Sequence, residues 1–239
     1  MNNKIDSEML TKIINLKKIG LSISDISSKF NVSDTTILKY TKDIPHPNRK
    51  FISKLPKYAL DLSNEKAEIL GYLCSEGSDN NFLDNYNGYD KRRNKYYLRN
   101  SLREWINFTN MDKILQNRFI YLMNHVYDYP LNIYNKGSFC IRRKIVVKDL
   151  RDYTIFGSRR WNVPKLLFEN RFIEQTKFFI RAYLDGDGTV DIKKKAVIVD
   201  SVNLKGLKNI DKLFNKLGIK TKFYIYKSRC RIVSKDVKK

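Results

Sequence analysis

Two short stretches of this sequence share one pattern, and each ends in an acid followed by a glycine. Residues 180–188 read Ile-Arg-Ala-Tyr-Leu-Asp-Gly-Asp-Gly, and residues 69–77 read Ile-Leu-Gly-Tyr-Leu-Cys-Ser-Glu-Gly. Aligned without a gap, Glu76 falls on Asp187. Carboxylate oxygens are the ligands that Mg²⁺ prefers in proteins. The repeat therefore predicts that two acids far apart in the chain serve one metal site.

Small residues precede both acids at helical spacing. Gly71 aligns with Ala182, and one turn later Ser75 aligns with Gly186. Small residues at this spacing let two helix backbones approach closely, so we expect the two runs to pack side by side about a pseudo-twofold axis. The acids would then meet at the C-terminal ends of both helices, where the helix dipoles are negative. A divalent cation would compensate that charge.

The candidate site combines the two acids with the glycines that follow them. Its expected catalytic residues are Glu76 and Asp187, and its expected metal site adds Gly77 and Gly188. Metal ions at a phosphate activate a water and stabilise the leaving oxygen, so this pattern predicts phosphodiester hydrolysis. For a single copy, an acid beside a turn-forming glycine is the simpler interpretation. Two aligned copies favour the metal site.

The charge of the chain predicts a polyanionic partner. Its 239 residues include 47 Lys and Arg against 25 Asp and Glu, which gives a formal net charge of +22. Nucleic acid is the first candidate for such a partner. No apolar run approaches the roughly 20 residues that span a bilayer, and the polar N-terminus lacks the apolar segment of a signal peptide. We expect no membrane association and a cytoplasmic or nucleoid-associated protein.

The cysteines favour neither a disulfide framework nor a zinc site. Cys74, Cys140 and Cys230 are far apart and odd in number, and the sequence has no Cys-x-x-Cys pair. This pattern is typical of a reduced protein.

Residues 1–44 predict a small all-helical domain. We expect its helices over residues 7–19, from residue 22, and over residues 34–42. Ser7 can cap the first helix and Ser33 the third. In the third helix, Ile37 and Leu38 would pack inward.

This domain resembles the short helix-turn-helix of DNA recombinases and bacterial regulators. In that family the third helix enters the major groove. The resemblance implies DNA contacts from Ser33, Thr35, Thr36 and Lys39. The alternative is a helical packing domain that touches no DNA.

A polar and basic linker is expected over residues 45–63, where three prolines block helix formation. The first large repeat would occupy residues 64–168 and the second residues 169–239. Both are expected to run helix, hairpin, helix, hairpin, and the first would add a last helix from Lys148 to Phe156. The counterpart of that helix would be missing from the second repeat.

Three details of the first repeat are also predicted. Strands are expected over residues 105–108 and 138–147, with partial strand over residues 80–103. Trp105 and Trp161 would lie in the core, and Ile114 would face inward from a helix over residues 111–126.

Both motif stretches resemble those of the LAGLIDADG homing endonucleases in their monomeric, double-motif form. The second copy, Ala-Tyr-Leu-Asp-Gly-Asp-Gly, matches closely, and the first resembles the Ser-Glu-Gly variant of the motif. The resemblance covers roughly residues 64–235. It implies an α+β fold of two pseudo-symmetric αββαββα repeats, whose antiparallel sheets form a DNA-binding saddle. It also implies a monomer that cleaves long double-stranded DNA sites with Mg²⁺.

The resemblance assigns roles to particular acids. The metal-binding acid is the last acid of each motif, which is Glu76 in the first copy and Asp187 in the second. Asp185 aligns with Cys74, so it receives no catalytic role. Family members also place a basic residue near the scissile phosphate, for which Lys144 and Lys235 are candidates.

The predicted sheets carry Arg, Lys, Tyr and Asn on their exposed faces, a composition that suits phosphates and base edges. The candidate DNA contacts in the repeats are Arg92, Arg93, Arg142, Lys144, Lys194, Lys227 and Arg229. Solvated charge is the alternative for the lysine-rich turn at residues 193–195.

Three functions remain open at this point. The first is a site-specific DNA endonuclease, which the presence of both motif acids favours. The second is a non-cleaving transcription regulator on the same fold, which the added helix-turn-helix and the missing last helix favour. The third is an intron maturase that binds structured RNA, because a basic sheet suits either polymer.

Overall fold

The computed structural model describes residues 5–18, 23–44, 54–90, 94–131, 133–135 and 137–235. Its contacts divide the chain into two units, one up to Ser53 and one from Lys54 onward. Within the described residues, no helix combines the length and apolar character that a membrane crossing requires.

Within its described residues, the first unit contains the helices α1 (Ser7–Lys18), α2 (Ile23–Phe30) and α3 (Asp34–Thr41). Its core is formed by Ile13, Ile26, Val32 and Ile37.

Two details of this unit differ from prediction. The α1 cap is Asp6, whose carboxylate accepts a 2.7 Å hydrogen bond from the backbone N–H of Met9, so Ser7 is already inside the helix. Leu38 is half exposed, because the helical period turns it away from its buried neighbour Ile37. Ser33 caps α3 as predicted, accepting from the backbone N–H of Thr36.

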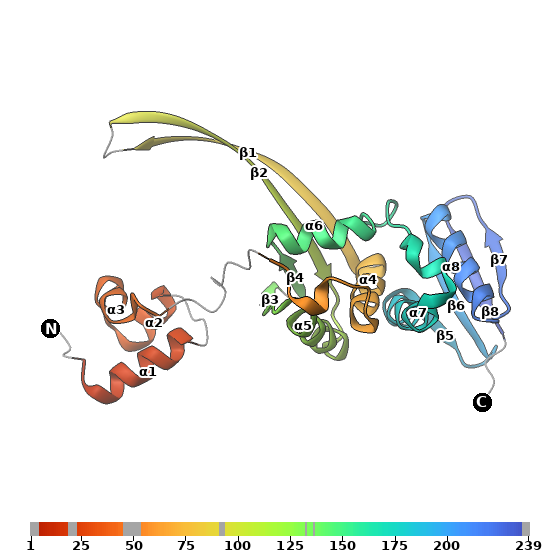
Figure 1. The fold of residues 1–239 in the computed structure, drawn as a ribbon, viewed down its shortest axis with the longest axis horizontal. Helices are drawn as coiled ribbons and strands as arrows, with labels where there is room; N and C mark the ends of the chain where they lie inside the picture. Colours follow the sequence, from red (N-terminus) through yellow and green to blue (C-terminus); the bar gives the residue numbers. More distant parts are fainter. Residues whose placement is uncertain are drawn as a thin grey trace. The chain divides into compact units, whose positions relative to one another are not determined.

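The second unit contains two four-stranded antiparallel sheets and their helices (Figure 1). The first repeat comprises α4 (Asn64–Glu76), β1 (Gly77–Asp90), β2 (Lys95–Thr109), α5 (Lys113–Tyr127), β3 (Ile133–Asn135), β4 (Ser138–Ile141) and α6 (Lys144–Tyr153). The second comprises α7 (Ile173–Asp187), β5 (Gly188–Asp191), β6 (Ala196–Ser201), α8 (Leu204–Lys216), β7 (Lys222–Ile225) and β8 (Cys230–Ser234). Among the residues that the structure describes, 3₁₀ turns lie at Lys57–Ala59, Lys165–Phe168 and Asn170–Phe172.

The two sheets have equivalent topologies. Their strand orders are β1-β2-β4-β3 and β5-β6-β8-β7. In the first sheet Gly77 pairs with Phe108, and in the second Gly188 pairs with Val199, so each motif glycine starts the corresponding strand. The predicted α+β duplication of helix, hairpin, helix and hairpin is confirmed.

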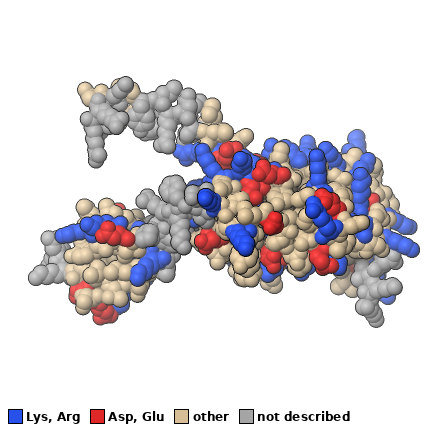
Figure 2. Space-filling view, viewed as in Figure 1, with Lys and Arg blue, Asp and Glu red and all other residues tan. Residues whose placement is uncertain are grey.

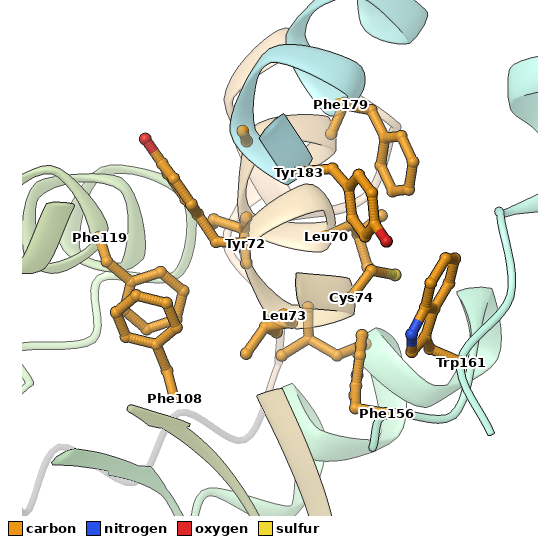
Figure 3. Close-up of a cluster of buried hydrophobic side chains, with 14 of the residues drawn as sticks. Leu70, Tyr72, Leu73, Cys74, Phe108, Phe119, Phe156, Trp161, Phe179 and Tyr183 are labelled. Carbon is orange, nitrogen blue, oxygen red and sulfur yellow. The ribbon is translucent and has the colours of Figure 1, made fainter. Parts of the chain in front are cut away.

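The core gathers around α4 and α7, the two motif helices, which lie side by side. Leu70, Leu73 and Phe179 are fully buried between these helices and their neighbours (Figure 3). Phe108 from β2 and Phe119 from α5 stack with their ring centroids 4.0 Å apart. The sheets and outer helices therefore fix the two motif helices from several directions.

The first repeat differs from prediction in its strand lengths and one helix boundary. β1 and β2 pair continuously from Gly77 to Asp90, where only partial strand was expected. The predicted strand over residues 138–147 ends at Ile141, and α6 begins at Lys144 rather than Lys148. Val146 and Val147 are buried on α6, so their apolar character reflects a helix face and not a strand.

Two buried positions were also predicted incorrectly. Trp161 is buried at 3% exposure, but Trp105 is only half buried, because it alternates with the buried Ile106 across the sheet. Ile114 is 77% exposed on α5.

Residues 54–63 were expected in the linker, yet Ala59 and Leu62 belong to the core of the second unit.

Candidate active site

The four predicted interface residues lie between α4 and α7. A Cβ atom on Gly71 would lie 2.8 Å from the Cβ of Ala182 and would also collide with the backbone carbonyl of Phe179. A Cβ atom on Gly186 would collide with the Ser75 side chain and lie 3.1 Å from the Cγ of Glu76. Small residues therefore let the two backbones meet, and the close approach continues to the acid end of α4.

Both motif helices end in the same way. The backbone N–H of Gly77 donates to the carbonyl of Leu73, and that of Gly188 donates to the carbonyl of Leu184. A Cβ atom at either glycine would collide with the carbonyl oxygen that accepts this bond. Each chain then turns directly into a strand. The glycine makes this abrupt exit possible and leaves the preceding acid at the last position of its helix.

Asp187 lies in a setting that disfavours its charged form. Burial, together with the nearby Glu76 carboxylate, raises the pKa of Asp187 to about 7. The structure thus brings together two acids that are separated by more than a hundred residues in the sequence. Their mutual repulsion marks a place where a cation would be favoured.

Glu76 has a neighbour that the sequence did not indicate. The side-chain amide of Asn110 donates a 2.9 Å hydrogen bond to the Glu76 carboxylate. Burial raises the pKa of Glu76, and this hydrogen bond opposes the shift. Asn110 follows the end of β2, so the first hairpin returns to support the acid from which it started.

Strand register reveals the counterpart of Asn110. Because Gly77 pairs with Phe108 and Gly188 with Val199, Asn110 in the first repeat corresponds to Ser201 in the second. Ser201 lines a cavity beside Asp187. Extending the repeat alignment through both hairpins would have found this pair, but the hairpins differ in length and conceal the correspondence.

That cavity, of about 250 Å³, joins Asp187 to basic and hydroxyl side chains. Its lining residues are Ser75, Ser158, Trp161, Asp187, Asp200, Ser201, Val202 and Arg229. Asp200 accepts two hydrogen bonds from Arg231, at 2.9 and 2.8 Å, and lies 3.9 Å from Arg229. Arg229, one of the predicted DNA contacts, therefore lines the same cavity as Asp187.

The tyrosines of the two motifs have different surroundings. The Tyr183 hydroxyl is buried beside Asp187 and Ser201, and burial together with Asp187 raises its pKa well above the ordinary value. Figure 3 shows Tyr183 near Cys74 and Trp161. Tyr72 instead directs its hydroxyl toward Glu68 and Asp185, at 3.4 and 3.5 Å. Asp185 thus belongs to a separate polar cluster.

The residues present fit a divalent cation with oxygen ligands. Glu76 and Asp187 supply two carboxylates, and the pKa of Asp187 is raised by burial first and by the nearby Glu76 carboxylate second. Among the described residues, no cluster of three or more His, Cys, Asp or Glu side chains is placed to hold a metal. Mg²⁺ suits such a sparse site, because it keeps several waters and takes phosphate oxygens as ligands. Gly77 and Gly188 adjoin the carboxylates as the first residues of β1 and β5.

The predicted DNA contacts of the repeats occupy several places. Arg142 follows β4, and Lys144 begins α6, so neither lies within a strand. Both line a cavity at the first sheet, away from Asp187. Lys194 forms an exposed ion pair with Asp191, and Lys227 is exposed in the turn after β7. Arg92 and Arg93 lie outside the described residues.

The two candidates for a basic catalytic residue do not line the cavity beside Asp187. Lys144 lines the cavity at the first sheet, and Lys235 lines another with Lys220 and Lys222. Figure 2 shows Lys and Arg spread over one face of the larger unit, interspersed with fewer acids.

In the first unit, two of the predicted DNA contacts are already engaged with each other. Ser33 and Thr36 share a 2.7 Å hydrogen bond between their hydroxyls, and Ser33 also caps α3. Thr35 and Lys39 are exposed on the same helix. The role of this unit in DNA binding remains a prediction.

Comparison with known proteins finds a family model that matches part of this chain. The model of the LAGLIDADG-like domain matches residues 174–236. No curated protein matches the chain by sequence.

Solved structures with a similar arrangement include the homing endonuclease I-DmoI. In its complex with DNA and Mn, I-DmoI is 12% identical, with 73% of this chain and 90% of that chain covered and a TM-score of 0.49. Full-length DUF199/WhiA from Thermatoga maritima is 11% identical, with 80% of this chain and 56% of that chain covered and a TM-score of 0.46. The family model matches the repeat that contains Asp187. The LAGLIDADG resemblance predicted from the two motif stretches is thus confirmed over residues 174–236, which match the LAGLIDADG-like domain.

Proposed function

We propose that this protein is a site-specific endonuclease that hydrolyses phosphodiester bonds of double-stranded DNA with Mg²⁺ or another divalent cation. The observation that carries this proposal is the meeting of Glu76 and Asp187 at the ends of two packed helices, with the pKa of Asp187 raised by burial and by Glu76. Two acids in such a setting are poorly explained by stability, because each would be better solvated elsewhere.

Each residue of the site has a part in this proposal. Glu76 and Asp187 would hold the cation, which when bound polarises a phosphate and acidifies a water. Asn110 orients Glu76 through its hydrogen bond. Arg229 shares a cavity with Asp187 and offers positive charge to a phosphate oxygen. The Tyr183 and Trp161 rings, whose centroids lie 5.1 Å apart, pack against each other beside this site.

The net charge of +22 supports the same polymer as substrate. Neutralising phosphates with Lys and Arg releases counterions, which gives strong binding that weakens with salt. We propose that the protein acts as a monomer, because both acids come from one chain.

Cleavage of a genomic plasmid library tests the proposal. The purified protein is incubated with Mg²⁺ and plasmids that carry genomic DNA of the source organism, and new ends are mapped by sequencing. We expect cuts at one family of sequences, and we expect Glu76→Gln and Asp187→Asn each to abolish them. Glu174→Gln is the matched control, because this carboxylate on α7 is exposed. Tight binding to DNA with no cutting in any of the three cations Mg²⁺, Mn²⁺ and Ca²⁺ would contradict the proposal.

A non-cleaving DNA-binding regulator is the second candidate. The three-helix unit supports it, because Thr35 and Lys39 are exposed on α3. The same library distinguishes the two functions, since a regulator would retain bound sequences and leave them intact. Preferential retention of structured RNA would instead favour a maturase.

A further inference from the structure

The two repeats meet mainly through α4 and α7, and this contact decides where the two candidate metal-binding acids stand. Its closest part is formed by Gly71, Ala182 and Gly186, where added side-chain atoms would collide. Small residues let two backbones approach, but ridges and grooves of side chains fix how packed helices lie against each other. A contact with few such ridges needs another feature to set the axial position of one helix against the other.

A buried carboxylate of α4 supplies a contact with a defined direction. The Glu68 side chain is 1% exposed, and Arg118 of α5 donates two hydrogen bonds to it, at 2.8 and 2.6 Å. The guanidinium of Arg181 on α7 lies 3.0 Å from the same carboxylate. Within the described part of the chain, this is the one ion pair that joins α4 to α7. Tyr72 also reaches from α4 to Asp185 on α7, at 3.5 Å, which is a much weaker contact.

The pseudo-symmetry of the molecule shows that packing alone does not require this ion pair. The alignment of the two motifs places Glu68 on Phe179 and Arg181 on Leu70. Leu70 and Phe179 are both fully buried, so the equivalent positions on the other side of the pseudo-twofold axis are apolar. Apolar residues would also avoid the cost of removing a charge from water. The ion pair therefore indicates a role in position more than in stability.

Loss of the Arg181 charge should cost the fold little. Glu68 would keep both hydrogen bonds from Arg118, so its buried charge would stay compensated. The Arg181 side chain is itself half exposed, and its guanidinium lies over the Phe178 ring, 4.7 Å from the centroid. The substitution would thus remove the link between α7 and α4 without leaving a buried charge unpaired.

The ion pair lies well away from the two acids. Glu68 precedes Glu76 by eight residues, and Arg181 precedes Asp187 by six, which corresponds to about 12 and 9 Å along the helices. An effect on the site must therefore act through the position of α7. A slide of one helical turn, about 5.4 Å, would carry Asp187 away from Glu76.

We propose that Arg181 is a positioning residue, whose ion pair with Glu68 fixes the axial position of α7 against α4 and so brings Glu76 and Asp187 to one cation. This inference rests on the proposed metal-dependent function. It deepens that function by naming a residue outside the site on which the site depends.

Mn²⁺ binding to the full chain, followed by the electron paramagnetic resonance signal of the free ion, tests the inference. Glu76→Gln/Asp187→Asn gives the background from other sites. Arg181→Met, which keeps an unbranched stem, should bind Mn²⁺ about tenfold more weakly than the wild type. Simple electrostatics predicts the opposite sign, because removal of a positive charge should strengthen the binding of a cation.

Two further variants separate positioning from folding. Arg181→Lys retains a charge that can reach Glu68, so it should restore most of the Mn²⁺ binding. Lys177→Met is the matched control, because it removes an exposed ion pair that lies within α7, and it should leave Mn²⁺ binding unchanged. We expect all three variants to keep the urea midpoint of the wild type.

A double variant shows whether Arg181 acts through Glu68. Arg181→Met/Glu68→Gln should bind Mn²⁺ no more weakly than the weaker of the two single variants, because both substitutions break the same contact. Fully additive losses would overturn the proposed route.

The remaining outcomes separate this inference from the proposed function. Unchanged or tighter binding in Arg181→Met, with a wild type that binds Mn²⁺, would overturn the inference and leave the proposed function intact. Weaker binding that accompanies a lower urea midpoint and is not restored by Arg181→Lys would also overturn the inference. A wild type that binds no Mn²⁺ above the background would instead overturn the proposed function.

Discussion

Asp187 is the residue whose chemistry depends most on its surroundings. It ends α7 in a partly buried position, and Glu76 lies close enough to raise its pKa further. Burial also raises the pKa of the counterpart Glu76, and the hydrogen bond that Asn110 donates to it opposes that shift. Two equivalent acids of the duplication thus differ in how readily they ionise.

The pKa of Asp187 predicts a pH effect on the metal-free protein. Its ordinary value is about 3.9 when unfolded and about 7 when folded. Between these values the folded state holds the extra proton, so the free energy of unfolding should fall as pH rises. The slope is at most about 1.4 kcal/mol per pH unit, and less because the carboxylate is partly exposed.

Urea denaturation across this pH range, with chelator present, measures the effect. Asp187→Asn should flatten the dependence, whereas the exposed control Glu174→Gln should leave it unchanged. A divalent cation should reverse the trend, because binding requires the deprotonated acid. An equally steep slope in Asp187→Asn would assign the effect to another group.

At the residue scale, the sequence predicted the two acids but not the side chains that surround them. The aligned motifs identify Glu76 and Asp187 because helix ends and glycines are local features. The positions of Asn110 and Ser201 beside the acids are set by strand register, which depends on where each hairpin turns. Asp200 lies on β6 and Arg229 directly before β8, and only the folded sheet brings these two residues to the cavity.

The packing of α4 against α7 is the element on which the site depends. The crossing is so close at Gly71 that a methyl group would meet Ala182 and the carbonyl of Phe179. Any separation of these helices would move the two acids apart. Stability and metal binding should therefore respond together to substitutions there.

Gly71→Ala tests this packing. In an uncrowded helix the change would stabilise by about 0.5–1 kcal/mol, but here overpacking should destabilise by about 1–3 kcal/mol. Thermal or urea unfolding gives the sign, with Glu174→Ala on the exposed face of α7 as control. A stabilised variant would show that the helices are further apart than described.

A buried ion pair ties α4 to α6 and to the segment before it. Lys66 is fully buried and donates to the carbonyl of Ala59 at 2.6 Å and to Asp149 at 3.0 Å. The Tyr127 hydroxyl donates to the same carboxylate at 2.7 Å. Burial lowers the pKa of Lys66, and Asp149 opposes this shift.

Lys66→Met should cost about 3–5 kcal/mol, because it leaves the Asp149 carboxylate without its cation. The double variant Lys66→Met/Asp149→Leu should recover part of the loss, since no unpaired charge then remains. Urea unfolding of the four combinations measures the coupling. Strictly additive losses would contradict a direct interaction between the two side chains.

Element order was largely predictable, and boundaries were less so. Apolar period and glycine positions located both motif helices and the second repeat's hairpins. The predicted end of the strand at residue 147 was wrong, because the buried pair Val146 and Val147 fits either a strand or a helix face. The assignment of residues 54–63 to the linker was wrong, because Pro45, Pro47 and Pro56 indicated a linker, whereas Ala59 and Leu62 are buried by tertiary contacts.

At the scale of the whole molecule, duplication creates the site. Neither repeat has more than one of the two acids, and each helix alone would present an ordinary C-terminal carboxylate. The two sheets share one topology, but the first hairpin is much longer and the second repeat has no helix after β8 within the described residues. A symmetric centre is thus combined with asymmetric surroundings.

The central claim is that Glu76 and Asp187 hold one divalent-cation site, and iron-directed cleavage of the protein tests it without any DNA target. Fe²⁺ substituted for Mg²⁺ in the presence of ascorbate and peroxide produces hydroxyl radicals that cut the chain next to the bound metal. We predict cuts near residues 76–77 and near 187–188 together, suppressed by excess Mg²⁺ and lost in Glu76→Gln/Asp187→Asn. Cuts at only one of these places, or the same cuts in the double variant, would contradict the shared site.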